Sequence, residues 1–367
     1  MRYELAKLPL RELFAPTSSA TAALVRLDER IARSPLGEGW VARSHFSDAC
    51  ACLWVDGELV HIEDLVLHDA GMGVRMPTHE LTIAGDVLRT RRRILSHPPG
   101  WALSAEGLRR LRQGEGDDEW APETKARRDV GNTLDDDEPD EDDPLARELA
   151  AIDAVLARSE ALLNAARDTS SKVRRERDPL VYEPDWNEDE RIGEWNAVIT
   201  ESADLPPVLR TALLLDAWNE LQVLEHAPWL GRLLAAALLR EAGLTTAHLL
   251  TFSLGLKQVP RARRGDRDRT VRLLAMIDAV AQAAEMGMRE HDRLVLARQQ
   301  MQHRLVGRRG SSKLPQLIDL VLSRPMVSAG MIAETLKVSP QGALRIAGEL
   351  NLRELTGRER FRAWGVL

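Results

Sequence analysis

The sequence predicts a mainly α-helical protein with a small separate module at its C-terminus. Hydrophobic residues make up 44% of the 367 residues, but aromatic residues only 4%. Ala, Leu and Arg recur at helical period over long stretches, which is typical of helices rather than strands. An acidic, periodicity-free segment interrupts this pattern at Gly114–Pro144. We therefore expect four regions: an N-terminal helical domain (1–113), an acidic disordered linker (114–144), a helical core (145–308) and a C-terminal module (312–367).

The apolar periodicity locates the helices of the body. Gly243 is placed to cap the helix Trp229–Ala242, and Gly287 is expected to break the last stretch into two. The predicted helices are Thr17–Ser34, Thr78–Leu95, Pro144–Ala166, Pro207–Glu225, Trp229–Ala242 and a broken pair within Arg267–Arg304.

The C-terminal module has the spacing of a helix-turn-helix. A first helix is predicted over Leu314–Ser323, and Ser328 is placed to cap a second helix, Ala329–Leu336. After a turn at Lys337, Ser339 caps a third helix, whose first position is a proline that needs no N–H partner. A short second helix, a tight turn and an amphipathic third helix are the elements of this motif.

Two alternating segments, Leu352–Thr356 and Phe361–Val366, follow the third helix and are joined by a charged tip. This pattern predicts a hairpin, so the fold class expected for the module is a winged helix-turn-helix.

The charge of the module favours nucleic acid as its partner. The whole chain has a net charge of −7, but from residue 304 to the end eleven Lys and Arg face five Asp and Glu. On the third helix, Arg345 can pair with guanine and Gln341 with adenine, while arginines of the hairpin can meet phosphates. We therefore expect double-stranded DNA as partner, with a homodimer as a further candidate because one module offers few base contacts. The expected DNA contacts are Ser339, Gln341, Arg345, Arg353, Arg358, Arg360 and Arg362.

Two segments of the body resemble Fic/DOC proteins. Val55–Leu65 (VDGELVHIEDL) resembles the I-E-G-x-x-x-x-L-E-D-L stretch of that family, in which Asp56 would replace the glutamate of an inhibitory helix. Glu225–Leu234 (EHAPWLGRLL) is similar to H-P-F-x-D-G-N-G-R-x-x-R-L-L, with His226 and Arg232 at the matching positions. The resemblance implies a helical Fic-like body. The D-G-N loop that would hold ATP phosphates is absent, so the body is expected to be catalytically degenerate and the chain not to be an enzyme.

The chain also resembles bacterial proteins that join a domain of unknown function to a C-terminal helix-turn-helix. Three functions stay open: a DNA-binding transcriptional regulator, a Fic-type AMP-transferase with His226 as base, and a protein-interaction or antitoxin-like module.

No cofactor, metal site or membrane segment is expected. Cys50 and Cys52 have neither a second cysteine pair nor a histidine cluster nearby, so we expect reduced packing residues. The histidines of the N-terminal region are too widely spaced to predict metal ligands, and the charged N-terminus is neither a signal peptide nor a membrane span. The expected location is the cytoplasm, at the nucleoid when DNA is bound.

Overall fold

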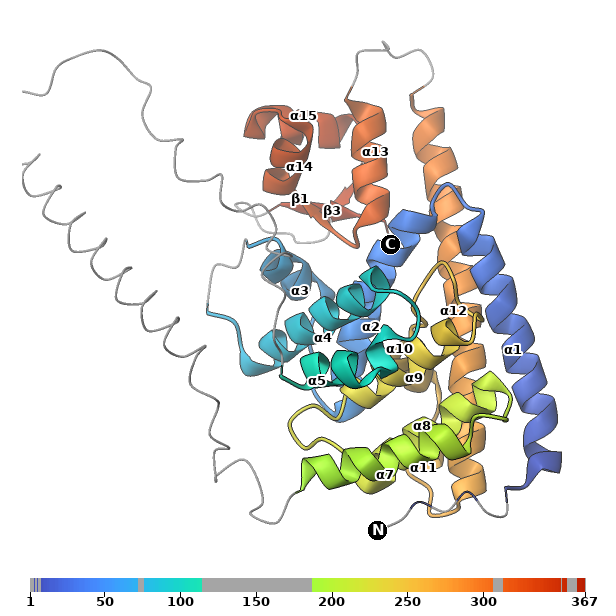
Figure 1. The fold of residues 1–367 in the computed structure, drawn as a ribbon. Coiled ribbons are helices and arrows are strands. Elements are labelled where there is room, and N and C mark those ends of the chain that lie inside the picture. The colour runs from blue at the N-terminus through green and yellow to red at the C-terminus, as the bar shows by residue number, and fades with distance from the viewer. Residues whose placement is uncertain are drawn as a thin grey trace, which may run out of the picture. The chain divides into compact units, whose positions relative to one another are not determined.

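The computed structural model describes residues 3, 5, 8–71, 76–113, 187–305, 313–350, 352–354 and 362–366. The chain divides into two units, one formed by Met1–Gly114 with Asn187–Leu367 and the other by Glu115–Trp186. All that follows concerns the first unit. It is mainly α-helical, as predicted (Figure 1). The acidic segment 114–144 and the predicted helix Pro144–Ala166 lie outside the described residues.

The body of the first unit is built from helices. In chain order they are α1 (Leu10–Ala32), α2 (Gly37–Asp56), α3 (Ile62–Asp69), α4 (His79–Ser96), the 3-10 turn η1 (Trp101–Leu103), α5 (Ala105–Gln113), α7 (Glu188–Glu201), α8 (Pro207–Leu221), α9 (Leu230–Glu241), α10 (Phe252–Gln258), α11 (Arg261–Arg264) and α12 (Arg269–His303).

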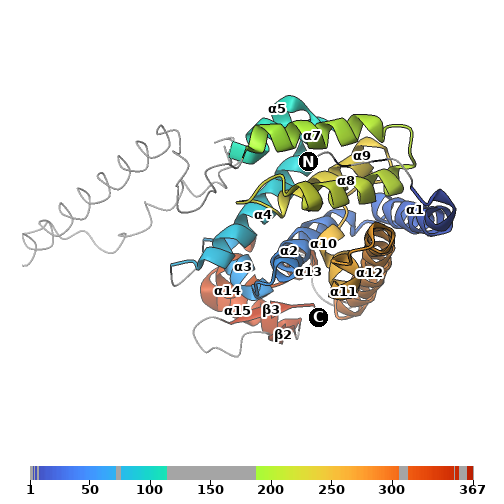
Figure 2. The same cartoon turned by 90° about the horizontal axis from the view of Figure 1, so that it is seen from below.

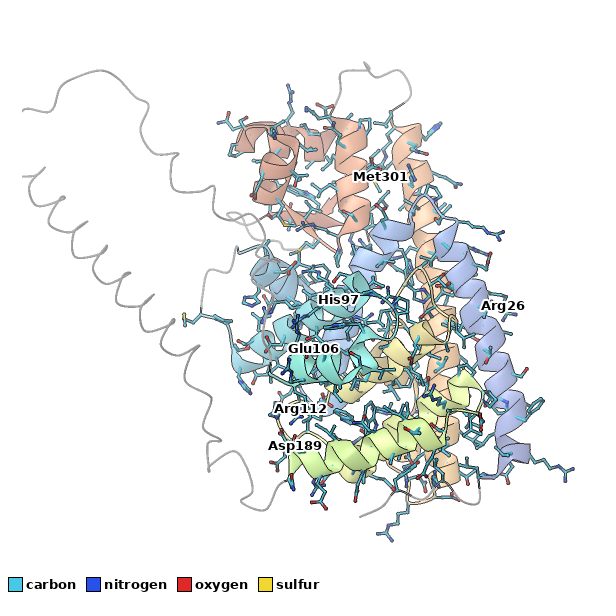
Figure 3. The ribbon with its side chains drawn as sticks, in the orientation of Figure 1. Arg26, His97, Glu106, Arg112, Asp189 and Met301 are labelled. Atoms are coloured by element: carbon cyan, nitrogen blue, oxygen red, sulfur yellow. The ribbon has the colours of Figure 1, made fainter. Side chains whose placement is uncertain are left out.

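One core joins helices from both sides of the segment 114–186. The long helix α12 packs along α1, α10 and α8, and α2 packs between α4 and α10 (Figures 1 and 2). Arg112 on α5 forms an ion pair with Asp189 at the start of α7, with Nη2 and Oδ1 3.0 Å apart (Figure 3). The sequence places 1–113 and 145–308 in separate domains, whereas the described helices of both ranges share their buried faces. Periodicity shows which face of a helix is apolar, but it does not identify the helix that covers it.

The expected break at Gly287 is wrong, because α12 runs without interruption through this residue. The glycine serves packing instead. A Cβ atom there would lie 2.7 Å from Leu27 Cδ2 and 2.9 Å from Trp40 Cζ2, and both distances are shorter than a Cβ atom tolerates. In addition, Trp40 Nε1 donates a hydrogen bond to the carbonyl of Gly287 at 3.1 Å. The missing side chain thus lets α1 and α2 approach α12 closely.

A buried carboxylate on α1 holds the loop between α9 and α10. Asp28 accepts hydrogen bonds from the backbone N–H groups of Thr246 (2.9 Å) and Ala247 (3.0 Å) and lies 2.9 Å from His248 Nδ1. Burial alone would raise the pKa of Asp28, but the hydrogen bonds from His248, Thr246 and Ala247 outweigh it and lower the pKa to about 2. Asp28 is therefore ionised at neutral pH.

A fully buried ion pair also holds this loop. Arg91 of α4 pairs with Asp48 of α2 and donates to the carbonyls of Leu249 (3.0 Å) and Leu250 (3.2 Å). Asp48 in turn accepts from the N–H of Leu254 at 2.9 Å, in the first turn of α10. The Arg91–Asp48 pair thus holds together α2, α4, the loop before α10 and the first turn of α10.

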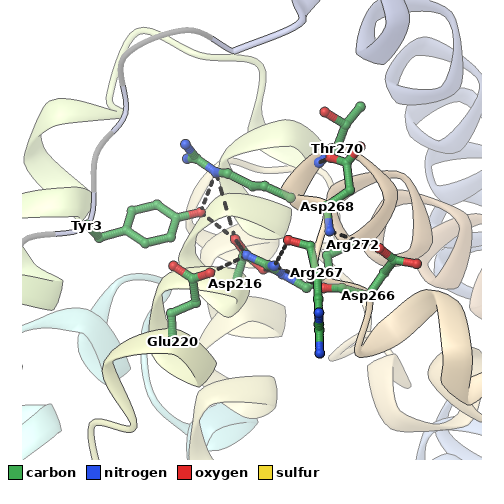
Figure 4. A network of polar contacts seen from close by, with 9 residues as sticks. Tyr3, Asp216, Glu220, Asp266, Arg267, Asp268, Thr270 and Arg272 are labelled. Carbon is green, nitrogen blue, oxygen red and sulfur yellow. Dashed lines mark hydrogen bonds and ion pairs between the residues drawn. The ribbon is translucent and has the colours of Figure 1, made fainter.

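A polar network ties the N-terminal segment to α8 and α12 (Figure 4). The hydroxyl of Tyr3 donates to Asp216 Oδ2 at 2.7 Å and accepts from Arg269 Nε at 3.1 Å. Arg272 Nε donates to the other oxygen of Asp216 at 2.7 Å. Burial and the adjacent Asp216 raise the pKa of Tyr3, so its hydroxyl stays protonated as a donor. This network anchors Tyr3 to α8 and α12.

Replacing Gly255 of α10 by Ala is expected to destabilise the protein by about 1–3 kcal/mol, because a Cβ there would lie 2.0 Å from the carbonyl oxygen of Ala279 on α12. Urea unfolding measures the change. Gly193→Ala is the matched control: Gly193 lies in α7 with nothing within 4 Å of the added carbon, so a stabilisation of about 0.5–1 kcal/mol is expected. Equal stabilities of the two variants would contradict the close contact of α10 with α12.

Candidate nucleic-acid interface

The described residues of the C-terminal module form three helices and three short strands. They are α13 (Leu314–Ser323), β1 (Val327–Ser328), α14 (Ala329–Leu336), α15 (Pro340–Glu349), β2 (Arg353–Glu354) and β3 (Ala363–Gly365). The bounds of α13 and α14 and the start of α15 agree with the prediction. The strands form an antiparallel sheet of order β1-β3-β2, in which β1 was not predicted from the sequence.

Local capping explains why α14 and α15 begin where they do and why α14 ends. Ser328 Oγ accepts from the N–H of Met331 at 3.2 Å, and Ser339 Oγ accepts from Gly342 at 3.1 Å. Between the helices, Lys337 adopts a left-handed conformation with φ of 50°, and Val338 N–H donates back to Ala333. This tight turn is the helix-turn-helix geometry expected from the sequence. The Ser339 hydroxyl, predicted to contact DNA, is used as a helix cap in the structure.

The two residues expected to read bases lie on the exposed face of α15. Ala343, Ile346 and Ala347 form the buried face, whereas Gln341 and Arg345 are exposed. The Arg345 side chain is 79% exposed, and its Nε lies 3.9 Å from Glu349 Oε1, a loose contact within the helix. The side chain of Gln341 has no hydrogen-bond partner among the described residues. Both side chains can therefore extend away from the module.

Arg353 and Arg362, two exposed arginines at the strands, differ in their contacts. Arg353 on β2 is exposed. Arg362, expected to be available for phosphate, instead donates from Nε (2.9 Å) and Nη2 (2.7 Å) to Glu354, and its guanidinium lies over the ring of Trp364. Hydrogen bonding to Glu354 raises the pKa of Arg362. Arg358 and Arg360 lie outside the described residues.

A buried arginine of the body holds the module, and sequence reasoning missed it. Arg43 of α2 is 5% exposed and pairs with Glu290 of α12, with Nε and Oε1 3.2 Å apart. Its two terminal nitrogens donate to the carbonyls of Val321 and Arg324 at the end of α13 and to that of Val366 after β3 (3.1 Å). The cation thus meets the negative end of the α13 dipole. No local pattern in the sequence marks these partners, which lie far along the chain.

The positions that resemble Fic proteins fall into two contacts. Arg232 of α9 forms a salt bridge with Asp56 at the end of α2 and also donates to Cys52 Sγ at 3.1 Å. His226 Nδ1 lies 3.2 Å from Glu188 Oε1 at the start of α7, and the neighbouring His226 lowers the pKa of Glu188. The structure therefore brings Asp56 and Arg232 together, and it pairs His226 with a residue that the resemblance does not include.

The cysteines of α2 form no disulfide: Cys52 is buried and Cys50 half-buried. Burial raises the pKa of the Cys50 thiol to about 12, which makes it a poor nucleophile at neutral pH. Within the described ranges, no three His, Cys, Asp or Glu side chains gather in a way that could hold a metal ion. None of the helices described is both long enough and apolar enough to cross a membrane.

Comparison with known proteins adds two family matches and one relative. Residues 314–367 match the family model described as "HTH DNA binding domain", and residues 180–306 match "Protein of unknown function (DUF1612)". Over 380 aligned residues the chain is 55% identical to "Uncharacterized protein y4cF" of Sinorhizobium fredii (strain NBRC 101917 / NGR234), and all of both chains is covered. These matches agree with the predicted pairing of a domain of unknown function with a helix-turn-helix.

Proposed function

Because the chain belongs to the same family as the y4cF protein of Sinorhizobium fredii and ends in an HTH DNA-binding domain, we propose that it is a transcriptional regulator that reads duplex DNA with α15. The observation that carries the proposal is the exposure of Gln341 and Arg345 on the face of α15 opposite the module's core. In helix-turn-helix proteins the second helix of the motif enters the major groove, where such side chains reach base edges.

The strands support a winged form of the motif. β2 and β3 pair antiparallel and flank residues 355–361, which contain Arg358 and Arg360. We propose that Arg353, Arg358 and Arg360 contact phosphates, while Arg362 contributes less because Glu354 already neutralises it. A regulator of this kind acts at the nucleoid in the cytoplasm. Binding as a dimer would double the few base contacts of one module.

Salt dependence tests this proposal directly. The full chain, titrated against a fluorescent mixed-sequence duplex, is expected to lose affinity as salt rises, with a slope of log K against log salt of about −3 if three arginines each neutralise one phosphate. Fluorescence anisotropy measures the affinity. A selection from a random duplex pool then tests for a preferred site. Absence of salt-dependent binding would end the proposal.

We further propose that the body is not catalytic. The AMP-transferase alternative needs a site for ATP phosphates, but the D-G-N loop is absent from the sequence and Arg232 is held by Asp56. Incubation of the full chain with ATP labelled on the adenosine is expected to leave protein substrates and the chain itself unlabelled. His79→Ala, a change at an exposed histidine of α4, is the matched control for His226→Ala. Labelling that disappears only in His226→Ala would establish the enzyme.

A further inference from the structure

A groove lies between α1 and α12, on a part of the body that the proposed DNA contacts do not use. Its walls are the C-terminal half of α1, the connection 34–36 and residues 288–302 of α12, and its volume is about 930 Å³. Ligand pockets for small molecules have volumes of about 300–1,000 Å³. This α1–α12 groove is therefore large enough for a metabolite-sized ligand.

The floor of the α1–α12 groove is apolar. Val25, Leu36, Met288 and Val295 line it, and Val25 remains 40% exposed. An apolar group placed there would remove this surface from water, which is favourable in proportion to the area covered.

The rim of the groove carries positive charge that is not neutralised. Four arginines line it, and two of them are paired: Arg30 with Asp292 at 2.7 Å, and Arg33 with Glu29 at 2.7 Å. The other two, Arg26 on α1 and Arg298 on α12, have no ion pair among the described residues (Figure 3 marks Arg26). Two unpaired guanidiniums on opposite walls of an apolar groove are complementary to an anion with an apolar body.

We propose that the α1–α12 groove binds a small organic anion, with its carboxylate or similar group between Arg26 and Arg298 and its apolar body on Val25, Met288 and Val295. Guanidinium groups bind carboxylates through paired hydrogen bonds, which orients the ligand as well as holding it. A polar contact in the wall, His291 Nε2 with Ser34 Oγ at 2.7 Å, offers a further place for a ligand oxygen.

The groove adjoins the residues that hold the C-terminal module. Glu290, the ion-pair partner of Arg43, immediately precedes His291, which lines the groove. Leu36, which also lines the groove, immediately precedes α2, the helix that contains Arg43. A ligand that shifts α12 against α2 would therefore alter the contacts of Arg43 with α13 and β3. Ligand binding is thus expected to change the affinity for DNA, and this part of the inference rests on the proposed function.

The probe for the groove is 8-anilinonaphthalene-1-sulfonate, a fluorescent organic anion with an apolar body. The full chain is expected to bind one molecule, and Arg26→Gln and Arg298→Gln are each expected to weaken binding about tenfold, as for loss of a charged hydrogen bond. Arg11→Gln, a change at an exposed arginine of the same helix α1, is the matched control and should leave affinity unchanged. Equal affinities of all three variants would overturn the proposal.

Competition then separates charge from apolar contact. Decanoate is expected to displace the probe more effectively than decanol, which has the same chain length without the charge; equal displacement would contradict the role of the arginines. Anisotropy with duplex DNA, with and without decanoate, measures the link to the module. Unchanged DNA affinity would overturn the link while the binding site stands, whereas absence of DNA binding under every condition would count against the proposed function and not against the groove.

Discussion

Replacing Arg345 by Glu is expected to abolish the preference of the full chain for its selected site. A bidentate contact of arginine with guanine is worth about 1–3 kcal/mol of discrimination, or roughly 5- to 150-fold in affinity, and the new negative charge adds repulsion from the DNA. The exposed Arg345 side chain lies on the face of α15 away from the core, so the fold should be unaffected. Anisotropy with the selected duplex and with a scrambled duplex gives the ratio of affinities.

Two comparisons make this prediction specific. Arg11→Glu introduces the same change of charge at an exposed position of α1 and should preserve the ratio. Arg358→Ala removes a proposed phosphate contact, so it should weaken both duplexes alike and make the salt slope shallower by about one. If Arg345→Glu and Arg358→Ala lowered the affinity for both duplexes equally, α15 would not be the element that reads sequence.

Replacing Arg91 by Met is expected to destabilise the protein by about 3–5 kcal/mol. The change leaves the carboxylate of Asp48 fully buried without its cation and removes the donors to the carbonyls of Leu249 and Leu250. Burial already raises the pKa of Asp48, against the opposing effect of Arg91, so loss of the arginine favours its neutral form further. Urea unfolding at neutral pH measures the loss.

A double variant separates the charge from the packing. Arg91→Met combined with Asp48→Leu removes both charges, so it should be more stable than Arg91→Met alone. Arg89→Met, at a 57% exposed position two residues away on the opposite face of α4, is the control and should change stability by less than about 1 kcal/mol. A double variant less stable than the single one would show that the unpaired carboxylate is not the source of the cost.

Some ambiguous local signals could be resolved only by tertiary contacts. Glycine within a helical pattern indicates either a break or a close approach, and at Gly287 the deciding facts are the positions of Leu27 and Trp40. Likewise, an arginine in a cationic hairpin can be free or paired, and the pairing of β2 with β3 places Glu354 beside Arg362. The resemblance of Val55–Leu65 and Glu225–Leu234 to Fic proteins gives no pairing by itself, whereas the packed helices bring Asp56 to Arg232.

The sequence by itself determined the helical class, the caps at Ser328 and Ser339 and the side of α15 that carries Gln341 and Arg345. These features depend on residues within about four positions of one another, so a linear pattern contains the information. Only the tertiary structure decided that α1 and α2 share a core with α12, that Arg43 holds the module, and that Arg26 and Arg298 face one groove. Those contacts join distant segments, and many partners are compatible with the same apolar face or the same charge until packing selects one.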